Sequence, residues 1–387
     1  MSYSVFKTQI EHLNSLKREI DKYPDEWEVV KRKINPYEHI FSGESSRISV
    51  AKIQPISRAF FKMIELIYPY KDIYTKPIRV LHLAESPGGF VQAWDWLRKN
   101  KAFVDDTMAI TLQKTKTDMP WKRLQEVSRT WTRRPHMLLG DLLDDDCRTK
   151  IVEDYKLDKA SLVTGDGGFD FSLDYCSQEE QAIPLILSEF VIALRCIADG
   201  GTLVLKVFDT FTLPMIQIIW VCSVKFEKFK LVKPKTSRAC NSEKYIVASG
   251  FKGICDNLET FLKRCEGILE AHSLPITTLF TEGQNSKYDT MVEGFRNTYE
   301  KNIRSLCQQQ IYWIEKGLRQ ITGTENDTET ESIVSNDIPL SLNWCRQHSV
   351  PINPYYYENY HRSWGRETSQ PSASQPPSPL LRHLPHT

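Results

Sequence analysis

Between residues 55 and 252, short apolar runs rich in β-branched residues alternate with longer segments of helical period. This alternation is typical of a parallel β-sheet covered by helices. The predicted strands are 79–84, 107–111, 136–140, 161–165, 202–208, 226–232 and 244–251. The predicted helices are 57–68, 88–99, 178–197 and 212–224. Because a short connection containing a proline joins the last two strands, we expect those two strands to pair antiparallel.

The segments on either side of this α/β region have other patterns. Residues 1–54 and 253–322 are of helical period and predict helical flanks. An acidic stretch at 323–340 predicts a flexible linker, and an aromatic-rich segment follows at 341–365. The tail at 366–387 is rich in Pro, Ser and Gln, a composition that predicts disorder.

Composition identifies a globular chain without an overall charge bias. The 387 residues are 41 % hydrophobic and 26 % charged, which suits one large domain with flanking segments. Fifty basic residues oppose 49 acidic ones, giving a net charge of +1. A nucleic-acid binder that relies on overall charge is therefore excluded, and such a partner must meet a local patch.

Several features favour an intracellular protein without a resident metal. No apolar run reaches the roughly 18 residues that cross a bilayer, and the N-terminus lacks the apolar core of a signal peptide. The nine cysteines include no CxxC pair, which argues against a disulfide framework or a zinc ribbon. We expect buried thiols and a nuclear location, or the host cytoplasm or virion for a viral protein.

Ionisable residues stand at the ends of, or inside, predicted strands. Asp141 and Asp166 each follow a strand, and Lys206 interrupts the apolar run 202–208. The carboxyl ends of parallel strands share one edge of a sheet, where ligands bind, and a lysine in a buried strand needs a partner for its charge. The alternatives are that each aspartate is only a helix N-cap and that the ammonium of Lys206 reaches solvent at the sheet edge.

Three more features point toward the same edge. The run LHLAESPGGFVQAW leads from a strand through a Pro-Gly-Gly turn into a helix, and Gly88 and Gly89 let the backbone approach a ligand closely. An ordinary strand-to-helix turn is the alternative. Glu243 precedes the last strand and lies at this edge if that strand runs antiparallel, while Lys62 interrupts an apolar helix before the first strand.

Taken in order, these motifs resemble those of the FtsJ-like RNA 2′-O-methyltransferases, most closely the cap-specific branch of eukaryotes and large DNA viruses. The resemblance runs from about residue 57 to 251 and rests on SRAFFKM, ESPGGF, GDGGFDFS, GGTLVLKVFD and SRACNSEKYIV. It implies an α/β, Rossmann-like S-adenosylmethionine-dependent methyltransferase fold over 55–252, with a seven-stranded sheet whose last strand is antiparallel. The Lys-Asp-Lys-Glu tetrad of the family matches Lys62, Asp166, Lys206 and Glu243.

The chemistry of methyl transfer to a ribose gives each tetrad residue a role. The sulfonium of S-adenosylmethionine is already a good electrophile, whereas a hydroxyl must be oriented and must lose its proton. Lys206 is the expected base, because burial and the charge of Lys62 lower its pKa toward neutrality, a shift that Asp166 and Glu243 partly oppose. Lys62 is expected to steer the oxygen and stabilise its developing charge.

The resemblance also implies the cofactor site, where a turn wraps the methionine part and Asp141 accepts a hydrogen bond from the adenine amine. The residues expected in the turn are Glu85, Ser86, Pro87, Gly88, Gly89 and Phe90. Two departures stand out. His82 replaces an acidic residue that often ends the first strand, for which Glu85 is the expected substitute, and no acidic residue ends the second strand at 110–112.

Two basic segments are expected to wall an RNA groove. Residues 114–134 hold seven basic and two acidic residues, and 225–238 hold six and one. The expected RNA contacts are Lys122, Arg123, Arg133, Arg134, Lys233, Lys235 and Arg238. A solvated charged face is the alternative. The aromatic candidates for stacking on a methylated guanine, among which the sequence does not choose, are Trp94, Trp121, Trp131 and the tyrosines at 355–357.

The sequence thus predicts a cap-specific mRNA 2′-O-methyltransferase whose partner is capped mRNA, with other capping or transcription proteins as further candidates and no membrane. The motif wording and the long flanks favour the cap branch. A 2′-O-methyltransferase of ribosomal or transfer RNA stays open as the alternative. An inert RNA-binding subunit is disfavoured by the intact tetrad, and a methyltransferase with a non-RNA substrate by the lysine pair.

Overall fold

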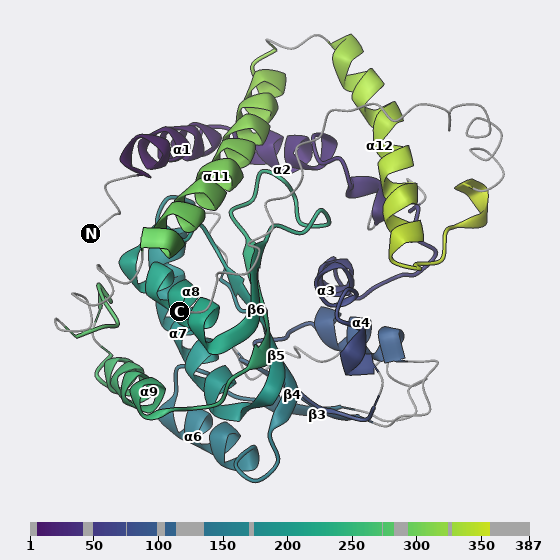
Figure 1. Cartoon of the computed structure of the whole chain (residues 1–387). Helices are drawn as coiled ribbons and strands as arrows, with labels where there is room; N and C mark the ends of the chain where they lie inside the picture. Colours follow the sequence, from purple (N-terminus) through teal and green to yellow (C-terminus); the bar gives the residue numbers. More distant parts are fainter. Residues whose placement is uncertain are drawn as a thin grey trace.

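A mixed seven-stranded sheet forms the centre of the protein in the computed structural model, which describes residues 6–41, 49–74, 76–98, 105–113, 135–169, 174–272, 274–281, 293–323 and 327–356 (Figure 1). The strands are β1 (Arg79–Leu83), β2 (Asp106–Thr111), β3 (His136–Leu139), β4 (Ala160–Gly165), β5 (Ile197–Val207), β6 (Phe226–Val232) and β7 (Lys244–Phe251). Their order is β3-β2-β1-β4-β5-β7-β6, and β7 is antiparallel to both of its neighbours. The predicted fold, with its antiparallel last strand, is confirmed.

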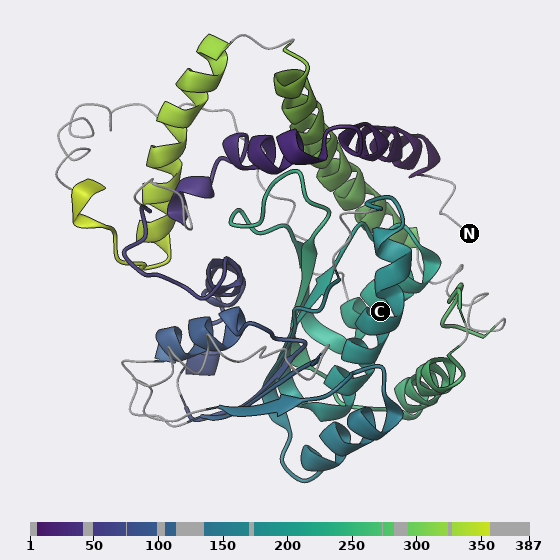
Figure 2. The ribbon, with the colours of Figure 1, turned by 180° about the vertical axis from the view of Figure 1, so that it is seen from behind.

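Helices cover both faces of this sheet (Figures 1 and 2). One face carries α3 (Ala59–Ile67) and α4 (Gly89–Arg98); the other carries α6 (Asp145–Asp154), α7 (Gln178–Cys196), α8 (Leu213–Lys225) and α9 (Asp256–Glu270). Side chains alternate along a strand, so Leu81 and Leu83 of β1 join the core under α7, and Val80 joins the core under α3. Burial on both faces explains the nearly continuous apolar runs of the sequence.

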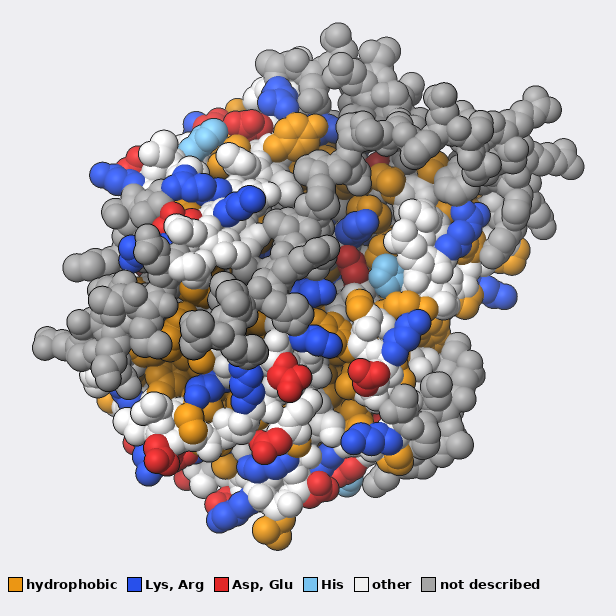
Figure 3. Space-filling model, in the orientation of Figure 1, with side chains coloured by type: hydrophobic (Ala, Val, Ile, Leu, Met, Phe, Trp, Pro, Cys, Tyr) orange, Lys and Arg blue, Asp and Glu red, His pale blue; other side chains and the backbone are white. Residues whose placement is uncertain are grey.

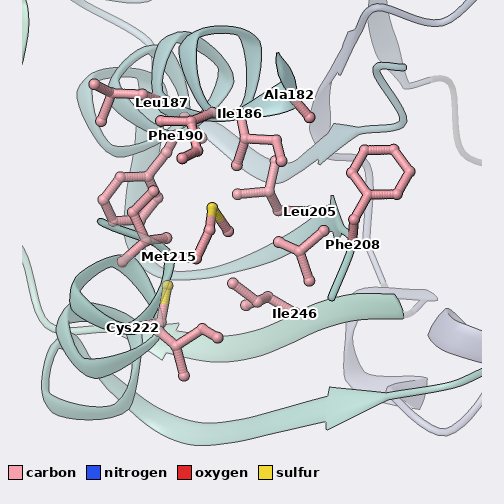
Figure 4. Packing of buried hydrophobic residues seen from close by; sticks show 14 of the residues in the cluster. Ala182, Ile186, Leu187, Phe190, Leu205, Phe208, Met215, Cys222 and Ile246 are labelled. Atoms are coloured by element: carbon pink, nitrogen blue, oxygen red, sulfur yellow. The ribbon is translucent and has the colours of Figure 1, made fainter. Parts of the chain in front are cut away.

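The core between α7, α8 and the sheet orients the central strand β5 (Figure 4). Phe190 of α7, Leu205 of β5, Met215 of α8 and Ile246 of β7 are all fully buried there. Because neighbouring residues of a strand point to opposite faces, the burial of Leu205 in this core directs Lys206 toward the α3 face.

The two helical flanks belong to the same core as the α/β region. Their elements are α1 (Lys7–Ile20), α2 (Pro24–Lys33), η2 (Glu38–Ile40) and α11 (Glu293–Ile321), whereas the short helix η3 (Lys71–Tyr74) lies within the α/β region. Phe6, just before α1, lies 6.0 Å from the ring of Phe211 and 6.3 Å from that of Tyr299. A Cβ on Gly317 of α11 would lie 2.6 Å from the ring of Trp27, so only glycine lets α2 and α11 pack this closely.

A helix replaces the linker that was predicted at 323–340. Helix α12 (Asp327–Gln347) runs through most of that stretch and into the aromatic segment. Its second half packs on α3: the ring centroid of Trp344 lies 5.8 Å from that of Phe61. The acidic composition predicted a linker. A local composition argument does not reveal the surface on which this helix docks, because that surface is on α3, far away in sequence. The predicted tail at 366–387 lies outside the described residues.

The structure can be compared with the expectations for cysteines, membrane spans and metal sites. All nine cysteines are free thiols, six of them buried, whereas Cys255 is exposed. Within the described part of the chain, no helix is both long and apolar enough to cross a membrane. The same residues include no group of three or more His, Cys, Asp or Glu side chains that could hold a metal ion.

We expect Trp344→Ala to destabilise the protein by about 3–5 kcal/mol, the cost of emptying a large buried aromatic site. The Trp344 indole is 1 % exposed and stacks on His348 with 4.3 Å between centroids, so its removal undocks α12 from α3. Chemical denaturation measures the loss. Leu157→Ala is the control, because Leu157 is 99 % exposed and should change stability by less than about 0.5 kcal/mol. Equal stability of the two variants would contradict the docking.

Candidate active site

A cavity of about 790 Å³ opens at the carboxyl edge of the parallel strands. Lys62, Asp166, Lys206 and Glu243, the four residues predicted to form a tetrad, all line this cavity. Their side chains are between 11 and 15 % exposed, so each is largely desolvated but still reaches the cavity. Its size suits a ligand, since small-molecule sites span about 300–1,000 Å³.

The four side chains form two ion pairs. Lys206 Nζ donates to the backbone carbonyl oxygen of Asp166 at 2.7 Å and lies 3.3 Å from Asp166 Oδ1. Lys62 Nζ donates to both carboxylate oxygens of Glu243, at 2.8 and 2.9 Å. Two ammonium groups, each held by a carboxylate, therefore face one cavity.

Four different elements bring these residues together. Lys62 comes from α3 and Asp166 follows β4 directly. Lys206 lies near the end of β5, and Glu243 precedes β7, whose antiparallel direction places its first residues beside the last residues of β5. Gly168 leaves room for the amine, because a Cβ there would lie 3.1 Å from Lys206 Nζ.

The charges around Lys206 correct the predicted direction of its pKa. Burial alone would lower the pKa of Lys206, but the charges of Asp166 and then Glu243 outweigh burial and raise it. The sequence prediction had the opposite sign, since it expected these two carboxylates to oppose burial and Lys62 only in part. Burial alone would likewise raise the pKa of Glu243, yet Lys62 and Lys206 together lower it to about 2.

Sequence reasoning missed Tyr245, which completes the polar cluster. Its hydroxyl donates to Asp166 Oδ1 at 2.7 Å, and its ring centroid lies 5.9 Å from Lys62 Nζ. Burial and the Asp166 carboxylate raise the pKa of Tyr245 well above its usual value, so it stays a neutral donor. The alternation of strand residues was an available signal, because Tyr245 points to the same face as Glu243.

Glu189 of α7 is a second missed residue. Its Oε1 accepts a hydrogen bond from the backbone N–H of Gly167 at 3.0 Å, which fixes the loop after Asp166 from below. Burial raises the pKa of Glu189 to about 8, although Lys206 opposes the shift, so the carboxyl group is mostly protonated at neutral pH. A single glutamate in the apolar helix LILSEFVIAL was its only signal.

The predicted cofactor turn divides between the cavity and the core. Ser86 and Pro87 line the cavity, whereas Glu85 does not. The Glu85 carboxylate accepts from the backbone N–H groups of Phe90, at 2.7 Å, and Val91, at 3.1 Å, and so holds the start of α4. Phe90 itself is fully buried in the core under α3.

Glycines give this turn its close approach to α3. A Cβ on Gly89 would lie 2.4 Å from Ser57 Oγ, and Gly88 has a φ of 108° that favours glycine. His82, which replaces an acidic residue of the family, is fully buried beneath the turn and lies 2.7 Å from Thr164 Oγ1 through its Nδ1. Burial lowers the pKa of His82 to about 3, so the ring is neutral.

The residues at the cofactor end of the cavity suit an adenosyl group. Asp141 lines this end together with Gly140, Leu142 and Thr111, so a carboxylate stands among apolar and small side chains. Asp141 Oδ1 also accepts from the N–H of Leu143 at 2.9 Å, whereas the N-cap of α6 is Asp144, so Asp141 holds a local turn in the cavity wall and caps no helix. A carboxylate beside apolar walls can accept from an exocyclic amine, and this lining therefore fits the predicted methyl donor.

The residues expected to bind RNA lie in different settings. Lys122, Arg123, Arg133 and Arg134 lie outside the described residues, as do Trp121, Trp131 and Tyr357. Lys233 Nζ donates to the carbonyl oxygens of Asn241 and Glu243 at 2.6 and 2.9 Å, and so braces the loop before β7. Arg238 forms an ion pair with Glu38 at 3.1 Å, whereas Lys235 is exposed.

Neither the described aromatic candidates nor the charges of the described surface identify a site for RNA. Trp94 is buried and donates to Asp105 at 3.0 Å, which makes it a core residue, while Tyr355 is 48 % exposed. On the face shown in Figure 3, the Lys and Arg side chains of the described residues are interspersed with acidic ones.

Comparison with known proteins identifies the family. The model of the FtsJ-like methyltransferase family matches residues 55–251, about half of the chain. The chain therefore belongs to the FtsJ-like methyltransferases, in agreement with the motifs and with the sheet order. The matched region contains the whole sheet and all four residues of the predicted tetrad.

Curated relatives share parts of this chain. A cap-specific mRNA (nucleoside-2′-O-)-methyltransferase 2 of Drosophila melanogaster is 27 % identical over 259 residues, covering 62 % of this chain and 36 % of its own length. An uncharacterised protein of Acanthamoeba polyphaga mimivirus is 23 % identical over 319 residues, covering 76 % and 37 %. The Xenopus laevis cap-specific mRNA (nucleoside-2′-O-)-methyltransferase 1 is 37 % identical over 156 residues, covering 38 % and 18 %. The chain spans about a third of the length of the first two.

Solved structures resemble the fold at a distance. A ribosomal RNA methyltransferase structure from Plasmodium falciparum covers 51 % of this chain and 99 % of its own, with a TM-score of 0.39 and 20 % identity. The fold assignment rests on the strand order and on the family match.

We expect Tyr245→Phe to lower kcat about tenfold and to leave the affinity for S-adenosylhomocysteine unchanged, because the Asp166 carboxylate loses the hydroxyl that orients it. Single-turnover kinetics and calorimetry measure the two quantities. Tyr155→Phe is the matched control, since that buried hydroxyl donates to the Val80 carbonyl at 3.1 Å on the other side of the sheet. A normal kcat in Tyr245→Phe would make the Asp166 contact merely structural.

Proposed function

We propose that the protein is an S-adenosylmethionine-dependent RNA 2′-O-methyltransferase that modifies a nucleotide next to the 5′ cap of mRNA. The observation that carries the proposal is the arrangement of Lys206–Asp166 and Lys62–Glu243 as two adjoining ion pairs in one cavity. An ammonium–carboxylate pair provides both an orienting charge and a proton acceptor, which are the two requirements for activating a hydroxyl. The family match supports the reaction class.

Each residue has one task in the proposed reaction. S-adenosylmethionine supplies the methyl group as a sulfonium. Lys206 Nζ, as the neutral amine, accepts the proton of the ribose hydroxyl as the oxygen–carbon bond forms and the carbon–sulfur bond breaks. Lys62 holds the hydroxyl oxygen and stabilises its developing negative charge. Asp166 and Glu243 keep the two amines in place, and Tyr245 fixes Asp166.

The proposed reaction needs Lys206 as a neutral amine, and the charges around the cavity decide its protonation state. Carboxylates raise the pKa of Lys206, so its amine is protonated at neutral pH when they act alone. A positively charged methyl donor next to the lysines acts in the opposite direction and lowers that pKa. Binding of the donor therefore favours the neutral amine that the reaction needs.

The cap specificity is supported by relatives and not by the cavity itself. Several relatives are named cap-specific mRNA methyltransferases, and each shares only part of its length with this chain. Residues 114–134, with Arg133 and Arg134, remain our proposal from the sequence for phosphate binding, together with Lys235. Methylation of ribosomal or transfer RNA is the alternative that the substrate assay below separates.

The transfer rate should rise with pH from about 6 into the alkaline range. Only the neutral form of Lys206 accepts a proton, and because its pKa is raised, the neutral fraction grows about tenfold per pH unit below that pKa. Single-turnover rates with saturating donor and RNA measure the profile. Lys206→Met should be inactive at every pH while S-adenosylhomocysteine binding stays within a few-fold. A profile that is flat between pH 6 and 9 would remove Lys206 as the base.

Transfer of tritiated methyl groups to three matched short RNAs tests the substrate. One RNA carries a cap, one begins with a triphosphate, and one carries a cap but has 2′-deoxyribose at its first two nucleotides. We expect transfer to the first RNA alone, because the tetrad activates a 2′-hydroxyl. Equal transfer to the triphosphate RNA would favour the ribosomal or transfer RNA alternative. Transfer to the deoxyribose RNA would place the methyl group on another atom.

A further inference from the structure

Part of the cavity lining comes from residues that the family match does not include. The flanking helices contribute Lys17 and Ile20 of α1, Trp27 and Lys31 of α2, and Gln310 and Ile314 of α11 to its lining. All six lie outside residues 55–251, and the two lysines are paired with Asp209 and Glu28. The cofactor end and the tetrad thus belong to the shared domain, whereas this wall, which we call the flank wall, belongs to the parts added on either side. Figures 1 and 2 show α1 and α2 end to end, with α11 crossing both of them.

Gln310 is the exceptional residue of the flank wall. It occupies one position of the stripe by which α11 packs against the core, between the buried residues Cys307 and Ile314. Its side chain is only 4 % exposed, yet the amide forms no hydrogen bond with another described residue. Gln310 is not among the described side chains whose buried polar atoms lack a hydrogen-bond partner, so the little exposure that it keeps lies at its amide. Because Gln310 lines the cavity, this amide is available to a ligand there.

The surroundings of Gln310 define what it can bind. Trp27 is 5 % exposed and packs against Gly317, which lies about two turns after Gln310 on α11. Ile20 and Ile314 add apolar surface to the cavity wall. The amide offers two donors and one acceptor in one plane. A flat ligand with apolar faces and a mixed donor and acceptor edge matches this combination, and a nucleobase is such a ligand.

We propose that Gln310 reads the edge of a nucleobase of the RNA whose ribose lies at the tetrad, so that the flank wall selects the base. The proposal rests on the proposed function, since it needs an RNA strand in the cavity. Gln310 lines the same cavity as Lys62 and Glu243. The identity of the base that it contacts would then affect how well the ribose is placed. Sequence outside the methyltransferase domain would in this way set the preference of a domain that many enzymes share.

The experiment compares Gln310→Met with Gln309→Met. Methionine keeps the length of glutamine and removes its hydrogen bonds, and Gln309 is the exposed neighbour on the outer side of α11. Four capped RNAs that differ only in the first transcribed base are methylated by wild type and both variants, and a second set varies the second base. The readouts are KM for RNA, kcat, the affinity for S-adenosylhomocysteine and the melting temperature.

We expect Gln310→Met to raise the KM of the preferred RNA about tenfold, the effect of one lost hydrogen bond, and to reduce the difference among the four bases. The melting temperature should not fall, because the substitution removes no hydrogen bond with another described residue. The affinity for S-adenosylhomocysteine and the behaviour of Gln309→Met should equal those of wild type. Gln310→Asn, which keeps the amide but withdraws it by one methylene, should also lose the base preference.

Three results would decide against the inference. Unchanged KM and base preference in both Gln310 variants would show that the amide contacts no base. A large fall in melting temperature with normal base preference in Gln310→Asn would make the residue purely structural. Wild-type protein that methylates all eight RNAs equally would mean that no base is selected, whereas wild-type protein that methylates none of them would overturn the proposed function instead.

Discussion

The site depends on one buried charge, the ammonium of Lys206 in the middle of an apolar strand. A strand that is covered on both faces tolerates a lysine only if other groups replace its hydration. Asp166 supplies a backbone carbonyl and a carboxylate oxygen to this ammonium, at 2.7 and 3.3 Å. The neighbouring loop is fixed in turn by Glu189 and Tyr245, so the geometry of Asp166 is determined from two sides. These contacts hold the amine at the carboxyl edge, where the cavity opens.

The second lysine needs a different support, because Lys62 comes from a helix on the covering layer. Glu65, one turn further along α3, accepts from the backbone N–H groups of Lys235 and Thr236, at 2.8 and 3.1 Å, and from the indole N–H of Trp344 at 3.3 Å. This carboxylate ties α3 to the loop before β7 and to α12. The C-terminal helix therefore contributes to catalysis, in our proposal, by fixing the helix that presents Lys62.

The N-terminal flank is joined to the same centre through a buried ion pair. Lys17 of α1 lies 2.6 Å from Asp209, three residues after Lys206, and Lys244 of β7 lies 3.7 Å from the other oxygen of Asp209. Breaking such a pair leaves an uncompensated buried charge. Helix α1 is consequently fixed relative to the end of β5, and the flank wall is held over the tetrad. The flanks and the shared domain thus form one structure around one cavity.

The sequence by itself determined the strands, the helices of the α/β region and the residue types at the sheet edge. Strands that are buried on both faces need continuous apolar runs, and a lysine such as Lys206 is conspicuous in such a run. Tertiary structure decided the rest, because it depends on contacts between distant residues. The folded arrangement of Asp166 and Glu243 around Lys206 raises its pKa against the expected shift, and the Glu85 carboxyl accepts from the start of α4. Residues 327–347 form a helix whose Trp344 docks on α3, where the composition predicted a linker. The place of Gln310 in the cavity wall is likewise decided only when α11 packs over the cavity, since burial is a property of the folded chain and not of the residue.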